Sequence, residues 1–244
     1  MTTVTAALGH ALYGQKGMVS RDENAVLPFR DRAEAGRVLA TKLRHYADKP
    51  DAIILALPRG GVPVAFEVAK ALRLPMEIFV VRKLGVPGQR ELAMGAIASG
   101  GVRVTNEGLV RALGISKEEI DVVAGQEQQE LERRERVYRE GRPMPDVRGR
   151  TVLVVDDGIA TGATIQAAVQ ALRAMEAARV VVAVPVAPAE AAELLRRPAD
   201  EVVCVAEPEP FFAIGQWYEN FPQLDDENVR ALLAQVHAPA EEAA

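Results

Sequence analysis

The stretch Thr151-Val-Leu-Val-Val-Asp-Asp-Gly-Ile-Ala-Thr-Gly-Ala-Thr164 decides the fold of this chain and the place of its polar groups. Residues 152–155 are an unbroken run of branched apolar side chains, typical of a strand that is covered on both faces. Residues 165–178 carry apolar side chains at helical spacing. The stretch therefore predicts a strand, a polar turn and a helix at the ligand-facing edge of a parallel sheet.

The chemistry of this turn suits a sugar phosphate. A helix N-terminus offers unpaired N–H groups and a positive dipole end to an anion, and the hydroxyls and small residues of 161–164 add donors and close backbone access. The carboxylates of Asp156 and Asp157 can accept hydrogen bonds from two vicinal sugar hydroxyls. Taken alone, Asp157-Gly158 is more typical of an ordinary tight turn, whereas the full run favours the binding role.

Two other phosphate-binding patterns fit the stretch less well. A triphosphate loop needs a lysine before its Ser or Thr, and this turn has none. A dinucleotide fingerprint needs three glycines at fixed spacing and an acid about 20 residues later, whereas here the acids precede the turn.

The run resembles the phosphoribosyl-pyrophosphate (PRPP) signature of type I phosphoribosyltransferases: four apolar residues, two acids, and a Thr-Gly-x-Thr/Ser turn. The resemblance implies that Asp156 and Asp157 hold the ribose hydroxyls. It implies Mg²⁺ as cofactor, bound mainly by PRPP and only indirectly by these acids. The PRPP-binding residues implied in the turn are Gly158, Ala160, Thr161, Gly162, Ala163 and Thr164.

Two further segments resemble parts of the same family. After the apolar run 52–57, Arg59 and the amides of Gly60 and Gly61 resemble the loop that binds pyrophosphate, although a plain turn with a surface arginine fits equally well. A strand at 76–81 precedes Lys83 and the glycine- and proline-bearing stretch 84–91, which resembles a flexible loop that closes over PRPP. Lys83 is thus a further catalytic candidate, while Arg90 is more typical of a solvated surface cation.

An aromatic-rich segment follows the predicted strand 201–205. It resembles the C-terminal segment of hypoxanthine-type enzymes, which implies that Phe212 stacks on the base, with Trp217 as a second candidate. Packing at the sheet edge is the alternative, and for Trp217 the favoured one. Two features depart from the purine pattern: Ala160 replaces the usual aspartate, and no lysine follows the strand 179–184.

From residue 52 onward strands and helices alternate, which predicts an α/β fold. The expected sheet is doubly wound and mainly parallel, of the type I phosphoribosyltransferase kind, with a helical insertion and a C-terminal hood-like segment. Further strands are expected at 92–98 and 102–105, joined as a hairpin through Gly100-Gly101. The expected helices cover 30–46, 62–73, 116–139, 163–177 and 188–196.

The chain divides into one domain with two ends. We expect residues 1–26 to be a flexible or atypical extension, 27–236 to form the phosphoribosyltransferase-like domain with an insertion at about 106–142, and 237–244 to be a disordered tail. The Arg133-Arg134-Glu-Arg136 cluster of the insertion is more typical of a solvated face than of a wall over the site.

Composition limits the classes of function. With 244 residues, 49% hydrophobic residues and a net charge of −5, the chain can bury a large core and is not a general nucleic-acid binder. The chain has no bilayer-length apolar run or signal peptide, and its one cysteine, Cys204, lies in an apolar run, so we expect no membrane association and a cytoplasmic location. Its three histidines lie far from the motifs, which leaves no histidine-based metal site.

The resemblance implies an Mg-dependent phosphoribosyltransferase of nucleotide salvage. Its partners would be PRPP and a small nitrogenous acceptor, and the resemblance implies a homodimer. The residues that would recognise a base are incomplete in this sequence. A non-catalytic regulatory protein on the same fold, which senses PRPP or a nucleotide, is therefore the alternative. A metal phosphohydrolase is disfavoured because the matching turns lack further acids and histidines.

Overall fold

The computed structural model describes residues 27–237 and contains two sheets. The larger sheet is parallel, with its strands in the order β2-β1-β6-β7-β8. Their bounds are β1 (Ala52–Ala56), β2 (Met76–Ile78), β6 (Thr151–Val155), β7 (Arg179–Val186) and β8 (Glu201–Ala206). This order confirms the predicted doubly wound, mainly parallel α/β fold. The predicted extension 1–26 and the tail after His237 lie outside the described residues.

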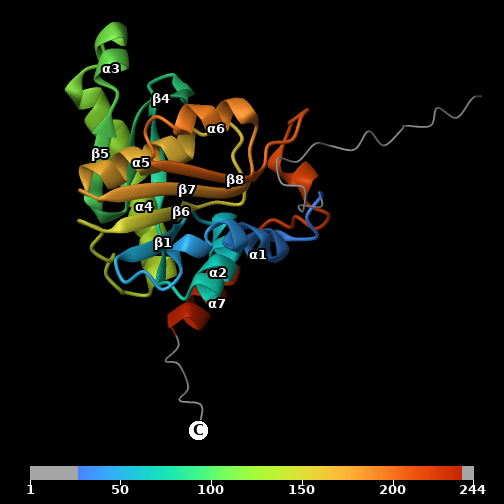
Figure 1. Ribbon diagram of the computed structural model, residues 1–244. Coiled ribbons are helices and arrows are strands. Elements are labelled where there is room, and N and C mark those ends of the chain that lie inside the picture. The colour runs from blue at the N-terminus through green and yellow to red at the C-terminus, as the bar shows by residue number, and fades with distance from the viewer. Residues whose placement is uncertain (1–26, 238–244) are drawn as a thin grey trace, which may run out of the picture.

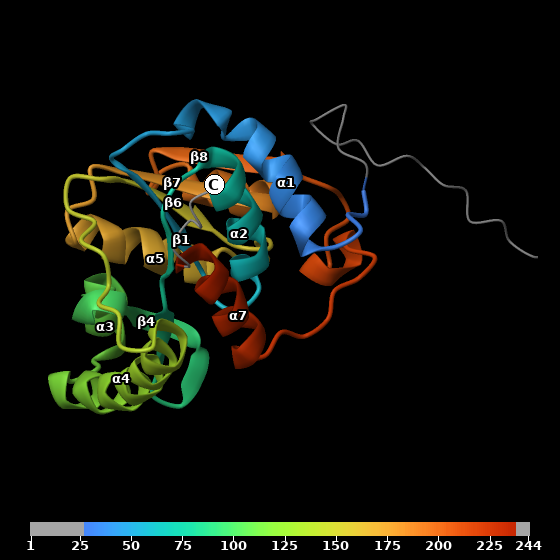
Figure 2. The same ribbon diagram turned by 90° about the horizontal axis from the view of Figure 1, so that it is seen from below.

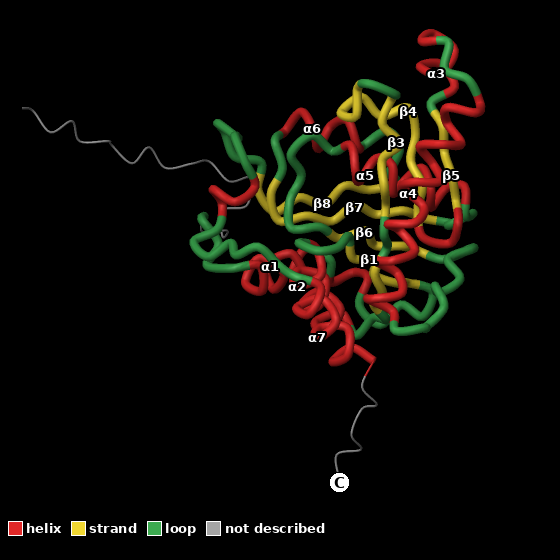
Figure 3. Tube along the Cα trace, turned by 180° about the vertical axis from the view of Figure 1, so that it is seen from behind, coloured by secondary structure: helices red, strands yellow, loops and turns green. Residues whose placement is uncertain are grey.

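Helices cover both faces of the parallel sheet (Figure 1). Strand residues alternate between the two faces, so Ile54 and Leu153 belong to one core while Ile53 and Val152 belong to the other. On the first face lie α1 (Arg32–Lys42), α2 (Gly61–Leu72) and α7 (Asp226–His237), and on the second α5 (Ala163–Ala174) and α6 (Ala189–Leu195). Figure 3 shows the strands from behind, enclosed between these helices. Because both faces are covered, the strands are apolar throughout, as the run 152–155 indicated.

The strand order changes direction between β1 and β6. From β1 the chain continues through α2 to β2 at one edge, and from β6 it continues through α5 toward β7 and β8. The two loops that follow these neighbouring strands begin side by side, and the amide of Leu57 donates to the carbonyl of Val155 at 2.9 Å. Ligands of open α/β sheets bind at such a switch point.

The region after β2 differs from the single strand at 76–81 and the loop at 84–91 that the sequence indicated. β2 ends early, and the chain enters a second, antiparallel sheet made of β3 (Val81–Val86), β4 (Gln89–Ala98) and β5 (Val102–Thr105). The prediction of a loop is wrong because Pro87 and Gly88 form only the hairpin turn, where Gly88 has a φ of 79°. The hairpin through Gly100-Gly101 is confirmed, since Ala98 pairs with Val102.

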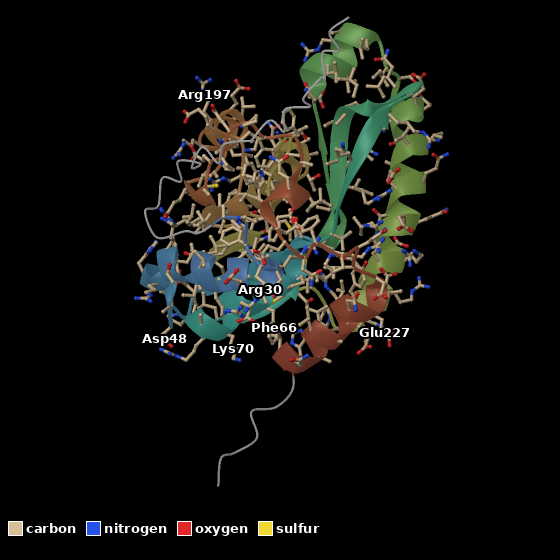
Figure 4. The ribbon with its side chains drawn as sticks, turned by 90° about the vertical axis from the view of Figure 1, so that its right-hand side faces the viewer. Arg30, Asp48, Phe66, Lys70, Arg197 and Glu227 are labelled. Carbon is tan, nitrogen blue, oxygen red and sulfur yellow. The ribbon has the colours of Figure 1, made fainter. Side chains whose placement is uncertain are left out.

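The insertion consists of two helices, α3 (Glu107–Leu113) and α4 (Lys117–Arg139). As predicted, Ser116 begins α4: its hydroxyl accepts from the amide of Glu119, whose carboxylate accepts from the amide of Ser116. Figure 4 shows α4 standing alongside the strands of the smaller sheet. Figure 2 shows both insertion helices apart from α1 and α2, whereas α4 contacts α7. The smaller sheet contacts α5 as well as α4.

The hood-like segment is residues 207–225, between β8 and α7. It passes through a short 3-10 helix at Ile214–Trp217, and the described residues contain two others, at Arg44–Tyr46 and Ser99–Gly101. The amide of Phe29 donates to the carbonyl of Trp217 at 2.8 Å, which joins the first described residues to this hood-like segment. The sequence did not predict α7. Within residues 27–237, no helix combines the length and apolarity needed to cross a membrane.

Candidate active site

The two predicted acids follow β6 at the switch point. The amide of Asp157 donates to Oδ1 of Asp156 at 2.9 Å, which orients the first carboxylate within the turn. The second carboxylate lies against the backbone of Gly60, where an added Cβ would stand 2.1 Å from Oδ2 of Asp157. The fold thus brings the acids into direct contact with the glycine turn after β1.

Arg32, the first residue of α1, forms a buried ion pair with the second acid. Its Nε donates to Oδ2 of Asp157 at 2.8 Å, and its Nη1 donates to the carbonyl of Pro222 at 2.9 Å. The guanidinium lies 3.7 Å from the ring centroid of Phe221, a cation–π contact. The Tyr218 hydroxyl donates to the backbone carbonyl of Asp157 at 2.5 Å. These contacts tie α1 and the hood-like segment to one carboxylate.

Burial raises the pKa of both carboxyl groups above their usual range. For Asp156 the neighbouring charge of Asp157 adds to the effect of burial. For Asp157 the hydrogen bond and charge of Arg32 oppose burial and favour the ionised form. Among the described residues, the pair therefore consists of one acid with a counter-ion in hydrogen-bonding contact and one without.

The turn beyond the acids surrounds a cavity of about 160 Å³. Gly162, with a φ of 78°, caps the N-terminus of α5, so the positive end of the helix dipole borders this cavity. The structure brings together Asp156 and every residue predicted to bind the phosphate. The lining consists of Asp156, Gly158, Ile159, Ala160, Thr161, Gly162, Ala163, Thr164, Ile165 and Ile214.

A second cavity, of about 380 Å³, lies on the other side of Asp157. Arg59 and Gly60 line it, as predicted for a second anion site, whereas Gly61 packs against β6, where a Cβ would stand 2.5 Å from the carbonyl of Val155. The complete lining is Arg32, Arg59, Gly60, Asp157, Phe221, Pro222, Gln223 and Leu224. Half of it comes from the hood-like segment, which the sequence did not place here.

Arg59 is held from the C-terminal side. Its Nη1 donates to the carbonyl of Leu224 at 2.5 Å, and its Nε lies 3.8 Å from Oδ1 of Asp226. The same Oδ1 accepts from the hydroxyl of Tyr138 at 2.6 Å, and Arg133 approaches Oδ2 at 3.5 Å. The Tyr138 hydrogen bond lowers the pKa of Asp226, while burial raises the pKa of Tyr138 to about 12. Helix α4 thereby reaches the loop after β1 through one carboxylate.

Lys83 lies in β3 beside a cavity of about 560 Å³ that α5 also lines, through Ala163 and Gln166 among others. In the described part of the chain its ammonium has no hydrogen-bond or ion-pair partner. Its neighbour Arg82 points to α4, where Nε donates to Glu127 at 2.7 Å. Arg90 lines a second groove, between the hairpin and α4, which Lys83 also lines. Lys83 thus faces the helix that begins at the phosphate loop, although the structure does not bring it into contact with the acids.

The two aromatic candidates have opposite environments. Phe212 is 84% exposed, and Trp217 is 3% exposed within the core, where its indole N–H has no hydrogen-bond partner among residues 27–237. Instead, Phe221 and Tyr218 stack with centroids 4.9 Å apart beside Arg32. Neither candidate lines the two cavities that flank the acids.

The candidate ligands for a magnesium ion are the carboxylate oxygens of Asp156 and Asp157. Among the described residues no group of three or more His, Cys, Asp and Glu side chains is placed to hold a metal. Mg²⁺ is usually bound through one or two carboxylates together with substrate phosphates and water. Arg32 already occupies one oxygen of Asp157. Asp156 and Asp157 therefore fit Mg²⁺ only in combination with ligand oxygens, as the indirect role predicted for them requires.

A family model described as the phosphoribosyl transferase domain matches residues 87–218, more than half of the chain. The chain belongs to the phosphoribosyl transferase family. This match includes both acids and the phosphate loop. Arg32, Arg59 and Lys83 lie outside it.

Individual relatives are similar to this chain over most of its length. Two Mycobacterium tuberculosis proteins, MT0597 of strain CDC 1551 and Rv0571c of strain H37Rv, have names that provisionally assign them as phosphoribosyl transferases. Each is 49% identical over 215 residues, which are 88% of this chain, and the chain spans about half (48%) of their length. The crystal structure of TT1426 from Thermus thermophilus is 40% identical, with a TM-score of 0.79, and the match covers 86% of this chain and 99% of that one.

Several site residues escaped the sequence analysis. Arg32 lay within an expected amphipathic helix, and Tyr218 and Phe221 lay within the aromatic-rich segment. The available signal was an arginine among the otherwise apolar core positions of the first helix, because buried arginines require a partner. The pairing of Arg32 with Asp157, 125 residues away, had no signal in the local pattern.

Proposed function

We propose that this chain catalyses the Mg-dependent transfer of a 5-phosphoribosyl group from PRPP to a nitrogenous base or related acceptor, with release of pyrophosphate. One observation carries the proposal. The acids lie between two cavities, one at the N-terminus of a long helix and one lined by arginines, at the switch point of the sheet. PRPP has the same order of groups: a phosphate, a ribose and a pyrophosphate.

The binding roles follow from this order. The 5′-phosphate occupies the smaller cavity, where the N-terminus of α5 and the hydroxyls of Thr161 and Thr164 donate to it. The ribose hydroxyls donate to the acids. The pyrophosphate lies toward Arg59 and Gly60, and Lys83 approaches from the hairpin side. Binding the phosphate far from the reacting carbon supplies orientation.

In the reaction, an acceptor nitrogen bonds to the anomeric carbon with inversion as the bond from that carbon to the pyrophosphate oxygen breaks. The electron pair leaves with pyrophosphate, and the proton of the acceptor nitrogen passes to solvent. Positive charge develops on the ribose, and the two carboxylates stabilise that charge more than they stabilise the ground state. Bound Mg²⁺ would supply charge neutralisation at the pyrophosphate.

For the acceptor we propose only a chemical class, a nitrogenous base or a related compound. Phe212 is exposed and free to cover a flat base, whereas Trp217 would act only through the packing of the hood-like segment. A homodimeric, cytoplasmic enzyme of nucleotide salvage remains the prediction that follows from the family resemblance.

The test combines binding with turnover. Protein, PRPP and Mg²⁺ are incubated with a panel of purine, pyrimidine and related nitrogenous acceptors, and mass spectrometry monitors pyrophosphate and the ribosylated product. We expect both to appear in equal amounts with at least one acceptor. PRPP binding without product across the panel would contradict transfer and support the sensing alternative. Failure to bind PRPP would contradict both.

A further inference from the structure

Arg32 lines the cavity of about 380 Å³, and its hydrogen bonds do not use all of its donors. Its Nε and Nη1 are bonded to Asp157 and Pro222, and its side chain is about nine-tenths buried. Within the described residues Nη2 has no hydrogen-bond partner, yet it is not among the buried, unpartnered atoms. Arg32 lines the cavity that Arg59 also lines, so Nη2 is the donor of Arg32 left to bind a ligand there.

The same cavity poses an electrostatic problem. Asp157 lines it too, so an anion placed beside Arg59 would lie close to a carboxylate. Like charges repel strongly in a partly desolvated site, so an anion there needs a positive charge close to this carboxylate. The Nε atom of Arg32, 2.8 Å from Oδ2 of Asp157, offsets the negative charge of this carboxylate beside the cavity.

The position of Arg32 is fixed before any ligand arrives. Its guanidinium lies on the ring of Phe221, and the carbonyl of Pro222 holds one edge of the fork. A guanidinium that is already held by Asp157, Pro222 and Phe221 loses little conformational freedom when it binds an anion. Lysine could carry the charge but could not make these contacts together.

We propose that Arg32 is a pyrophosphate-binding residue of this site, which neutralises Asp157 through Nε and donates to the leaving pyrophosphate through Nη2. The inference rests on the proposed function and deepens it. Arg32 and Arg59 then form the two sides of an anion site whose ligand class is a diphosphate ester.

The experiment compares two ligands that differ only at this end. Calorimetry with Mg²⁺ gives the affinities for PRPP and for ribose 5-phosphate, and their ratio isolates the pyrophosphate. For Arg32→Gln we expect the ratio to fall at least tenfold, while the affinity for ribose 5-phosphate changes less than threefold. The matched control is Arg30→Gln, an exposed arginine two residues away (Figure 4), for which the ratio should stay within twofold of the wild type.

Two further variants separate binding from folding. Arg32→Lys keeps a charge against Asp157 if Arg32→Gln unfolds, and the ratio should still fall several-fold because the fork is lost. In the double variant Arg32→Gln/Asp157→Asn the carboxylate no longer needs a counter-ion. The ratio should remain low if Nη2 binds pyrophosphate. A return to the wild-type ratio would show that Arg32 only neutralises Asp157 and would overturn the proposal.

The outcomes also distinguish this inference from the proposed function. A wild-type protein that binds PRPP, with an unchanged ratio in folded Arg32→Gln, contradicts the role of Arg32 alone. A wild-type protein that binds neither PRPP nor ribose 5-phosphate contradicts the proposed function itself.

Discussion

The two sides of the acid pair are built in different ways. On the phosphate side, one continuous stretch supplies the turn and the start of α5, and only Ile214 comes from elsewhere. On the arginine side, the lining comes from α1, the loop after β1, the second acid and the hood-like segment. The first side is a local structure, and the second exists only once the whole domain has folded.

This difference affects how each side responds to change. The phosphate side depends on backbone geometry and a helix dipole, which most surface substitutions leave intact. The arginine side depends on side chains that hold one another: Asp157 holds Arg32, and Leu224 and Asp226 hold Arg59. Substitutions far from the ligand should therefore affect the arginine side first.

The largest effect should come from Asp156, the acid without a built-in counter-ion. For Asp156→Asn we expect kcat to fall by about 100-fold or more, because a charge that stabilises the transition state is lost. Single-turnover kinetics with PRPP would measure it. A loss confined to KM would show that Asp156 contributes only binding.

The same variant should gain stability. The folded-state pKa of Asp156 is raised, so its protonated form fits the fold, and stability is lost as pH rises above the unfolded value toward the folded one. Asp156→Asn removes this cost, and each kcal/mol regained corresponds to about 2–4 °C in Tm for a chain of this size. Melting curves should show a gain over the wild type that is larger at pH 8 than at pH 4. A gain independent of pH would contradict the raised pKa.

Gly60 tests the contact between the two sides. An alanine Cβ there would stand 2.1 Å from Oδ2 of Asp157, so the acid must move, and displacement of a positioned group by about 1 Å can cost about 100-fold. We expect kcat/KM to fall by about that factor for Gly60→Ala. At Gly108 the nearest atom is 3.5 Å from an added Cβ, so Gly108→Ala is the matched control. Equal activity of the two variants would disprove the contact.

Lys83 should have a smaller effect. If its ammonium reaches the pyrophosphate, Lys83→Gln loses one charged hydrogen bond, which corresponds to about tenfold in PRPP affinity. Affinity for ribose 5-phosphate should not change. Lys70→Gln, on the far end of α2 (Figure 4), serves as control because it removes the same charge elsewhere. An equal loss for both ligands would exclude a pyrophosphate contact.

The smallest effect is expected at Asp226, which acts only through Arg59. An ion pair at 3.8 Å and partly exposed contributes little, so Asp226→Asn should weaken PRPP binding by about threefold. Glu227→Gln changes the next charge on α7, labelled in Figure 4, and should have no effect. Tighter PRPP binding by Asp226→Asn would mean that Asp226 competes with the ligand for Arg59 rather than positioning it.

The parallel sheet could be predicted because its strands carry their own signal. Residues 152–155 and 52–57 are apolar and branched, and each leads into a helical pattern. The hairpin 81–98 was missed because Gly85, Pro87 and Gly88 are read as a loop, although two of them form only a turn. Helix α7 was missed because its apolar positions are few and it lies close to the Ala- and Glu-rich end.

The candidate site divides in the same way. The acids and the phosphate loop could be located because they are adjacent in sequence, and the fold places them at one cavity. Arg32 and the backbone carbonyls of Pro222 and Leu224 could not, since a carbonyl group has no sequence signature and the contacts span more than 100 residues. The sequence pattern therefore predicts structure among neighbouring residues, whereas contacts between distant residues depend on how the strands and helices are connected.

The hydrogen bond from Tyr218 to the backbone of Asp157 has a consequence for how the protein is made. The acid pair emerges from the ribosome well before Tyr218, which is 61 residues further along the chain. Until that tyrosine and its neighbours dock, the nascent chain contains a carboxylate pair and an open sheet end without their cover. If the proposed ligand needs both cavities, its full site exists only after the hood-like segment has docked, so any protection that it gives against aggregation begins late in folding.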